Sequence, residues 1–214
     1  MVSPLEDMYT THHKGGRRKG FSILEADRGK LFTSLVGEGK QVLDIGCRDG
    51  TLTRYFTKNN SVLGVDIDAE LLNEARKQLG IETIIFDLNG SWSELGEKKF
   101  DVVVAGEVVE HLFFPQEVCA RVSAHLHPHG VFVGSVPNAF TLKHRLRYLF
   151  ASKKHTPLSD PTHINHFSVD ELRTLLLKHF DEVTIYGLGK YALLSKHFPS
   201  WFAFDLVFSA RKKS

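Results

Sequence analysis

The stretch VLDIGCRDG, residues 42–50, decides the fold, because an apolar run ends on an acid there and leads into a glycine-rich turn. This pattern predicts a short buried strand, a tight turn and then a helix over residues 51–57. Gly46 and Gly50 supply turn positions at which a Cβ would obstruct the bend or a ligand lying on the backbone. The N–H groups at the start of the helix would face the same place, so the stretch predicts a ligand site.

A second apolar run, SVLGVD at residues 61–66, ends on Asp66, which lies 22 residues after Asp44. In a doubly wound nucleotide-binding fold, an acid at the tip of the second strand binds the hydroxyls of a ribose. The glycines fall at 46 and 50 with Arg48 between them, which is not the G-x-G-x-x-G spacing of dinucleotide sites. The two strands therefore predict a nucleoside site and disfavour a nicotinamide-dependent oxidoreductase.

Composition sets the limits of the interpretation. A chain of 214 residues with 42% hydrophobic and 24% charged residues is typical of one soluble globular domain. The net charge of +2 does not indicate general binding to polyanions. The two cysteines lack C-x-x-C spacing, and no apolar run reaches the length of a membrane span. We therefore expect reduced thiols, a cytoplasmic location and no secretion signal.

The rest of the chain alternates between helical and extended patterns. Ser22 is the expected cap of the first helix, and Ser168 with Glu171 forms a capping-box pattern before the last one. The alternation predicts an α/β fold with a parallel sheet and one antiparallel edge. The predicted helices cover residues 23–35, 68–80, 92–95, 115–126, 140–150 and 168–179, and the predicted strands cover 41–45, 61–66, 81–86, 100–105, 130–136, 182–186 and 201–210.

The D-x-G-x-x-x-G turn followed by V-D-I-D resembles the class I S-adenosylmethionine-dependent methyltransferases, over roughly residues 40–135. The resemblance implies a doubly wound, Rossmann-like sheet of seven strands in the order 3-2-1-4-5-7-6, with the last strand antiparallel and helices on both faces. One position departs from the family pattern, because Arg48 stands where the middle glycine is usual. This arginine would either crowd the carboxylate of the cofactor or neutralise it.

The resemblance also implies contacts to S-adenosylmethionine. Asp66 would accept hydrogen bonds from the ribose hydroxyls, and Ile67 and Leu88 would lie against the adenine. Asp87 would accept a hydrogen bond from the adenine amino group, or else it caps the turn before Gly90. The full set of implied cofactor contacts is Asp44, Gly46, Cys47, Gly50, Asp66, Ile67, Asp87, Leu88 and Glu107.

The segment EVVEH, residues 107–111, follows the predicted strand at 100–105. On a helix, positions i, i+3 and i+4 share a face, so Glu107, Glu110 and His111 would converge at the cofactor end of the sheet. The E-x-x-E-H pattern resembles ubiquinone-pathway O-methyltransferases and the 3′-terminal ribose methyltransferases of small RNAs. The second group implies a further histidine ligand, for which His163 is a better match than His166.

Three interpretations of this cluster remain open. Glu107, Glu110, His111 and His163 could bind a divalent metal, Mn or Mg, of which mixed oxygen and nitrogen ligands favour Mn. Alternatively, His111 and Glu110 act as catalytic base and partner without a metal. In the third interpretation His111 is structural. The alternating His125, His127 and His129 are expected on the surface, in a loop at the distal end of the sheet.

Two basic segments lie outside the predicted strands. Residues 1–20 form a glycine-broken basic stretch, predicted to be a mobile arm that is either a solvated tail or a lid over the cofactor. Residues 21–214 would form the methyltransferase domain. Within it, residues 139–166 are expected to cover the acceptor pocket, although their helix would alternatively be an ordinary core helix with a basic outer side.

The sequence thus predicts a methyltransferase that acts on an oxygen of a small or lipid-like, anionic metabolite, with peripheral contact to a membrane surface as one option. Ribose 2′-O-methylation of an RNA end and a non-catalytic, methyltransferase-like regulatory protein are the alternatives. The sequence leaves open which acceptor is used, whether nitrogen or carbon replaces oxygen, and which oligomer forms.

Overall fold

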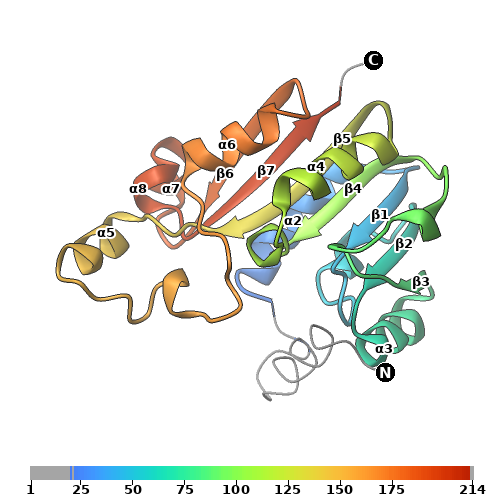
Figure 1. Ribbon diagram of the computed structural model, residues 1–214, viewed down its shortest axis with the longest axis horizontal. Helices are drawn as coiled ribbons and strands as arrows, with labels where there is room; N and C mark the ends of the chain where they lie inside the picture. The colour runs from blue at the N-terminus through green and yellow to red at the C-terminus, as the bar shows by residue number, and fades with distance from the viewer. Residues whose placement is uncertain (1–19, 21, 213–214) are drawn as a thin grey trace.

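The computed structural model describes residue 20 and residues 22–212, so the predicted arm over residues 1–20 lies almost wholly outside the described part. A seven-stranded sheet in the order β3-β2-β1-β4-β5-β7-β6 forms the centre (Figure 1). The first five strands are parallel, and β7 runs antiparallel to β5 and β6, which confirms the predicted topology. The strands are β1 Gln41–Ile45, β2 Ser61–Asp66, β3 Glu82–Ile85, β4 Phe100–Gly106, β5 Leu126–Pro137, β6 Glu182–Leu188 and β7 Asp205–Arg211.

Helices cover both faces of the sheet and bury two apolar clusters. On one face, Val122 of α4 and Leu172 of α6 are fully buried in a cluster with the strands. On the other face, Phe32 of α2 and Ala75 of α3 are fully buried. The α-helices are α2 Glu25–Val36, α3 Ala69–Leu79, α4 Pro115–His125, α5 Leu142–Leu149, α6 Val169–Leu177, α7 Ala192–His197 and α8 Pro199–Phe202. Short 3₁₀ helices are η1 Thr53–Tyr55, η2 Ser93–Leu95, η3 Val109–His111 and η4 Pro157–Ser159.

Two predicted helices are wrong. The helix expected over residues 51–57 is only the 3₁₀ turn η1, because the hydroxyl of Thr53 donates to Asp44 (2.7 Å) and the chain must re-enter the sheet at Ser61. The segment 107–111 is not an α-helix either. Glu107 has φ of 60°, in the left-handed region, and only Val109–His111 form the 3₁₀ turn η3.

Three element boundaries differ from the prediction. Ser22 does not cap α2, whose N-cap is Leu24; the Ser22 hydroxyl instead accepts a hydrogen bond from Arg28 Nη2 (2.7 Å). The strand predicted over residues 201–210 begins at Asp205, because α8 extends to Phe202 and two further residues connect it to the strand. β5 begins at Leu126, so residues 127 and 129 lie on a strand rather than in a loop, although both are exposed as predicted.

The register of the parallel strands determines where a ligand can lie. Asp44 of β1 is level with Gly64 of β2 and with Val104 of β4, so the carboxyl ends of the three strands lie at one edge of the sheet. The chain connections diverge between β1 and β4, and such a point is where open α/β sheets bind their ligands. Among the described residues, no helix is long and apolar enough to span a membrane.

Candidate active site

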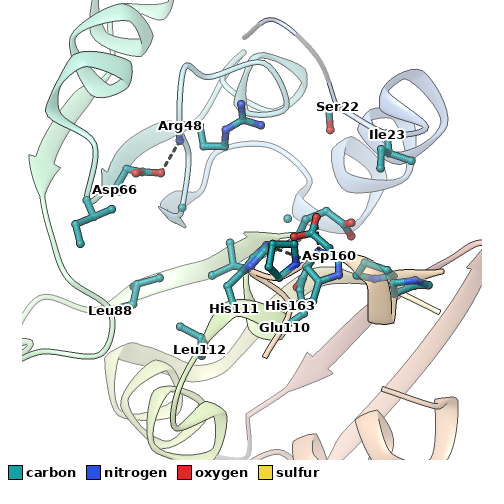
Figure 2. Close-up of a pocket in the computed structure, with 18 of the residues that line it drawn as sticks. Ser22, Ile23, Arg48, Asp66, Leu88, Glu110, His111, Leu112, Asp160 and His163 are labelled. Atoms are coloured by element: carbon teal, nitrogen blue, oxygen red, sulfur yellow. Dashed lines mark hydrogen bonds and ion pairs between the residues drawn. The ribbon is translucent and has the colours of Figure 1, made fainter. Parts of the chain in front are cut away.

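A cavity of about 780 Å³ lies at the carboxyl ends of the strands (Figure 2). The segments after β1, β2, β3 and β4 line one side, through residues such as Gly46, Asp66, Leu88 and Glu110. The chain between β5 and α6 lines the other side, with His144, His155, Thr156, Pro157, Ser159, Asp160, Pro161 and His163. A volume of this size is ample for a small-molecule ligand.

The turn after β1 forms the floor of the cavity and depends on its backbone conformation. Gly46 has φ of 71°, and a Cβ there would come within 2.5 Å of Val108 Cγ2, so only glycine fits. Arg48 is also left-handed, with φ of 52°, a conformation that costs a non-glycine residue about 1 kcal/mol or more. Asp66 holds this turn, because its Oδ2 accepts from Arg48 N (3.0 Å) and its Oδ1 accepts from Asp68 N (2.9 Å).

Six of the nine predicted cofactor contacts line the cavity. They are Gly46, Asp66, Ile67, Asp87, Leu88 and Glu107. The carboxylate of Asp87 also accepts a hydrogen bond from Asn89 N (2.9 Å), as expected if it shapes the turn, so the two interpretations of Asp87 are compatible.

The remaining three predicted contacts, Asp44, Cys47 and Gly50, do not line the cavity. They are buried in or beside the turn after β1. Asp44 is buried, and its burial raises the pKa of the carboxyl to about 7 in spite of the hydrogen bond from Thr53. Burial likewise raises the pKa of the Cys47 thiol well above its ordinary value. Gly50 has φ of 80° and packs on Leu79.

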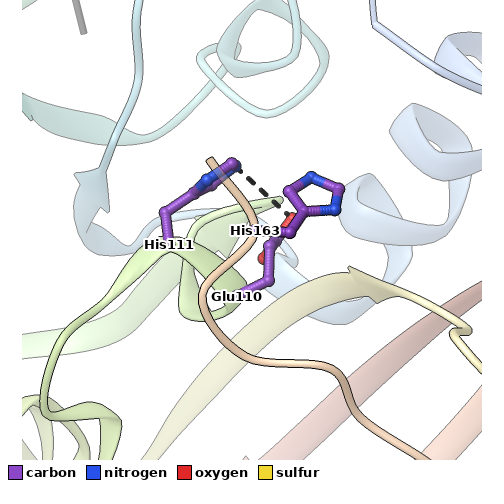
Figure 3. Close-up of side chains that lie close together, drawn as sticks. All are labelled: Glu110, His111 and His163. Atoms are coloured by element: carbon purple, nitrogen blue, oxygen red, sulfur yellow. Dashed lines mark ion pairs between the residues drawn. The ribbon is translucent and has the colours of Figure 1, made fainter. Parts of the chain in front are cut away.

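The second part of the site is formed by Glu110, His111 and His163. One ligand atom of each lies within 4.8 Å of the other two (Figure 3). His111 Nδ1 is 2.8 Å from the carbonyl oxygen of Thr162, so Nδ1 carries the proton and Nε2 is the nitrogen of the ring that carries the lone pair. Nε2 lies 3.9 Å from Glu110 Oε1. The chain segment before α6 thus brings a second imidazole, and a third possible ligand, to the turn after β4.

Burial controls the protonation of this cluster. Burial, followed by the negative charge of Glu107, raises the pKa of Glu110 well above its ordinary value. Burial lowers the pKa of His111 to about 4, so its ring is neutral near pH 7. Three buried polar atoms of the cluster have no hydrogen-bond partner among the described residues. They are the two carboxylate oxygens of Glu110 and Nδ1 of His163. A buried carboxyl with two unused oxygens beside two imidazole rings fits the donor set of a divalent cation.

Glu107, the fourth predicted metal ligand, pairs with Arg28 and Ser135 instead of joining the cluster. Its Oε1 lies 2.9 Å from Arg28 Nη1 and accepts a hydrogen bond from the Ser135 hydroxyl (3.0 Å). The shared face that we predicted for Glu107, Glu110 and His111 does not exist, because the segment is not an α-helix. Glu107 still lines the cavity, where it carries negative charge next to the cluster.

Sequence reasoning missed the buried partner of Glu107. Arg28 and Asp205 are each 1% exposed, and Arg28 Nη1 lies 3.5 Å from Asp205 Oδ2. Burial and the charge of Glu107 raise the pKa of Asp205 well above its ordinary value, and Arg28 opposes this shift. A lone acid inside the apolar run AFDLVF was the available signal. His144, which is buried at the cavity wall, was missed as well.

Comparison with known proteins supports the assignment of the fold. The profile of a family described as methyltransferase domain matches residues 18–180. A crystal structure of a SAM dependent methyltransferase from Archaeoglobus fulgidus superposes with a TM-score of 0.66 at 19% sequence identity, over 96% of this chain and 99% of that one. At that identity the likeness shows the fold alone.

Two curated relatives share part of the sequence. The ubiquinone biosynthesis O-methyltransferase of Pasteurella multocida is 34% identical over 119 residues, which are 49% of each chain. The malonyl-[acyl-carrier protein] O-methyltransferase of Halalkalibacterium halodurans is 27% identical over 159 residues, 70% of this chain and 58% of that protein. The chain spans about half the length of the curated relatives it matches. From its matched profile, its sheet order and the position of its cavity, the chain belongs to the methyltransferase domain family and has the class I S-adenosylmethionine-dependent methyltransferase fold.

Proposed function

We propose that this protein transfers a methyl group from S-adenosylmethionine to an oxygen of a small or lipid-like, anionic acceptor. The observation that carries the proposal is that one cavity contains both the Asp66 carboxylate and the cluster of Glu110, His111 and His163. The first is a nucleoside-binding group and the second is a proton-accepting or metal-binding group. Both relatives described above are named O-methyltransferases, which supports oxygen as the acceptor atom.

The cofactor half of the proposal assigns roles to the strand ends. S-adenosylmethionine, when bound, supplies the methyl group. Asp66 accepts hydrogen bonds from the ribose hydroxyls while it continues to hold the turn after β1. Ile67 and Leu88 provide apolar contact for the adenine, and the absence of a Cβ at Gly46 lets the ligand approach the backbone.

The acceptor half assigns roles to the buried cluster. Glu110, His111 and His163 would hold a divalent cation, Mn or Mg, which when bound would orient the acceptor and lower the pKa of its hydroxyl. The Thr162 carbonyl keeps the proton of His111 on Nδ1, so Nε2 can bind the cation or accept the hydroxyl proton directly. Methyl transfer would then depend chiefly on holding the acceptor oxygen in line with the methyl group.

Isothermal titration with S-adenosylmethionine tests the cofactor site. We expect binding to the unaltered chain and a loss of about 10- to 100-fold in affinity for Asp66→Asn, because a neutral amide replaces the charged acceptor of the ribose hydroxyls. Asp101→Asn is the matched control, because Asp101 accepts a hydrogen bond from Gln41 N at the opposite end of the strands. No binding by the unaltered chain at millimolar cofactor would reject the proposal.

Metal titration tests the acceptor site separately. Electron paramagnetic resonance of the free ion measures Mn²⁺ binding. We expect binding to be lost in Glu110→Gln and in His163→Gln and to be retained in His166→Gln. Chelation should then abolish methyl transfer and added Mn²⁺ should restore it. Transfer that persists under chelation would reject the cation and leave His111 as the base.

Transfer of labelled methyl groups identifies the class of acceptor. Label in a product that organic solvent extracts supports the proposed small or lipid-like metabolite. Label on the terminal ribose of RNA would favour the alternative acceptor, and cofactor binding without transfer to any acceptor would favour a regulatory protein.

A further inference from the structure

Helix α5 has its polar and apolar sides reversed relative to a helix that packs on a core. Its apolar residues Leu146, Leu149 and Phe150 are 53%, 76% and 79% exposed. The side toward the protein carries His144, which is buried, and Tyr148, whose hydroxyl donates to the Ala139 carbonyl (2.8 Å). A helix with this distribution has an apolar stripe that none of the residues described by the structure covers.

A second group of exposed apolar side chains lies next to α5. Leu193 of α7 is 74% exposed, Phe198 is 56% exposed and Trp201 of α8 is 43% exposed. The guanidinium of Arg145 on α5 lies 4.4 Å from the centre of the Trp201 ring, so the two groups are in contact. The three helices lie together at one end of the molecule, at the left of Figure 1. We call this surface, residues 142–154 and 190–204, the basic apolar face.

The charges on this surface have one sign. On the basic apolar face, residues 142–154 contain five lysines and arginines and residues 190–204 contain two, and neither segment contains an Asp or a Glu. All seven are at least partly exposed, and they are Lys143, Arg145, Arg147, Lys153, Lys154, Lys190 and Lys196. The chain as a whole has a net charge of only +2, so positive charge is concentrated on this surface.

We propose that the basic apolar face docks on an anionic lipid bilayer. Exposed leucine, phenylalanine and tryptophan side chains enter the boundary between headgroups and acyl chains, while adjacent lysines and arginines pair with anionic headgroups. A nucleic acid would use the charges but leave the aliphatic side chains unburied. A protein partner would need a matching acidic and apolar surface, and this outcome is distinguished by the test below.

The cavity adjoins the basic apolar face. His144 on α5 and Phe204, which is 48% exposed, both line the cavity. An acceptor with a lipid-like tail can therefore pass from the bilayer to the cavity without crossing water. Only this last step rests on the proposed function, because docking on lipid does not require methyl transfer.

Vesicle sedimentation of the full chain tests the proposal. We expect the protein to sediment with vesicles in which about one third of the phosphatidylcholine is replaced by phosphatidylglycerol, and to be released at high salt. Leu149→Ser with Phe150→Ser should weaken binding by about tenfold or more, because two apolar side chains no longer leave water. Lys143→Gln with Lys153→Gln should weaken binding to anionic vesicles and reduce its salt dependence.

The matched control places the same kind of change outside the basic apolar face. Ile85 and Leu177 are 57% and 49% exposed, and Ile85→Ser with Leu177→Ser should leave vesicle binding unchanged. Absence of sedimentation with anionic vesicles overturns the proposal, and so does equal loss in the control. Concentration-dependent dimers that Leu149→Ser abolishes, without vesicle binding, would assign the surface to a second copy and overturn it as well. S-adenosylmethionine binding, measured in parallel, reports on the proposed function independently.

Discussion

At the scale of single residues, the site is bounded by charged groups of which Arg28 and Asp205 are buried and Glu107 is partly exposed. Arg28 is the cation that compensates Glu107 and Asp205, which lie in the middle and near the end of the sequence. It also donates hydrogen bonds to the Ser135 hydroxyl and the Ile23 carbonyl. Such a buried network gives little net stability, but removing one member leaves the others without compensation.

We therefore expect Arg28→Met to lower the free energy of unfolding by about 3 kcal/mol or more, because Glu107 and Asp205 lose their buried counter-charge. Urea denaturation measures this loss. The double variant Arg28→Met with Asp205→Asn should recover part of the stability, since one of the two uncompensated acids is removed. A loss below about 1 kcal/mol in the single variant would show that the network is not coupled in this way.

At the scale of elements, the site is built from strand ends and short turns rather than from helices. Glu110 and His111 lie on the 3₁₀ turn η3, and His163 lies in the irregular chain before α6. Two backbone hydrogen bonds join these segments, because Ile164 N and Asn165 N both donate to the Glu110 carbonyl (2.9 and 2.8 Å). The turn and the later loop are thus held together by the backbone, independently of their side chains.

Helix α6 follows this loop and begins with a capping box. The Ser168 hydroxyl accepts from Glu171 N (3.2 Å), and the Glu171 carboxylate accepts from Ser168 N (2.9 Å). We expect Ser168→Ala to lower the free energy of unfolding by about 1 kcal/mol, because one N–H of the first turn loses its acceptor. Urea denaturation provides the measurement. Ser34→Ala, on the exposed side of α2, is the control and should change stability by at most about 0.5 kcal/mol; equal effects would contradict the capping role.

At the scale of the whole molecule, the burial of acids under the glycine turn couples global unfolding to pH. The folded chain raises the pKa of Asp44 from 3.8 to about 7 because the carboxyl is buried. Between these values the folded state keeps its proton while the unfolded state has lost it. Stability from this group is therefore present at low pH and decreases as pH rises from about 4 to about 7.

Asp44→Asn isolates this effect, because the amide is neutral at every pH and its oxygen can still accept from Thr53. As the pH rises from about 4 to about 7, the free energy of unfolding of the variant minus that of the unaltered chain should increase by on the order of 4 kcal/mol. Urea denaturation of both proteins over this range measures the difference, which cancels the contributions of the other titrating groups. Parallel stability curves would show that Asp44 ionises normally in the folded state.

The local pattern of the sequence was sufficient for the sheet. Apolar runs that contain or end on Asp44 and Asp66, with Gly46 and Gly50 at left-handed positions of the turn between them, indicate buried parallel strands whose carboxyl ends meet. The capping pattern at Ser168 and the acid at Asp68 likewise identified where helices begin, since these caps depend on neighbouring residues alone.

The sequence by itself determined the order of the seven strands along the chain and the edge of the sheet at which the cavity lies, but not α7 and α8 between the last two strands. Through a family resemblance it also indicated the approach of His163 to Glu110 and His111. Only the tertiary structure decided that Glu107 turns to Arg28 and that Asp205 is buried beside them, because these contacts join segments far apart in the chain. It also decided which side of α5 is exposed, since helical periodicity shows that a helix has an apolar side but not what covers that side.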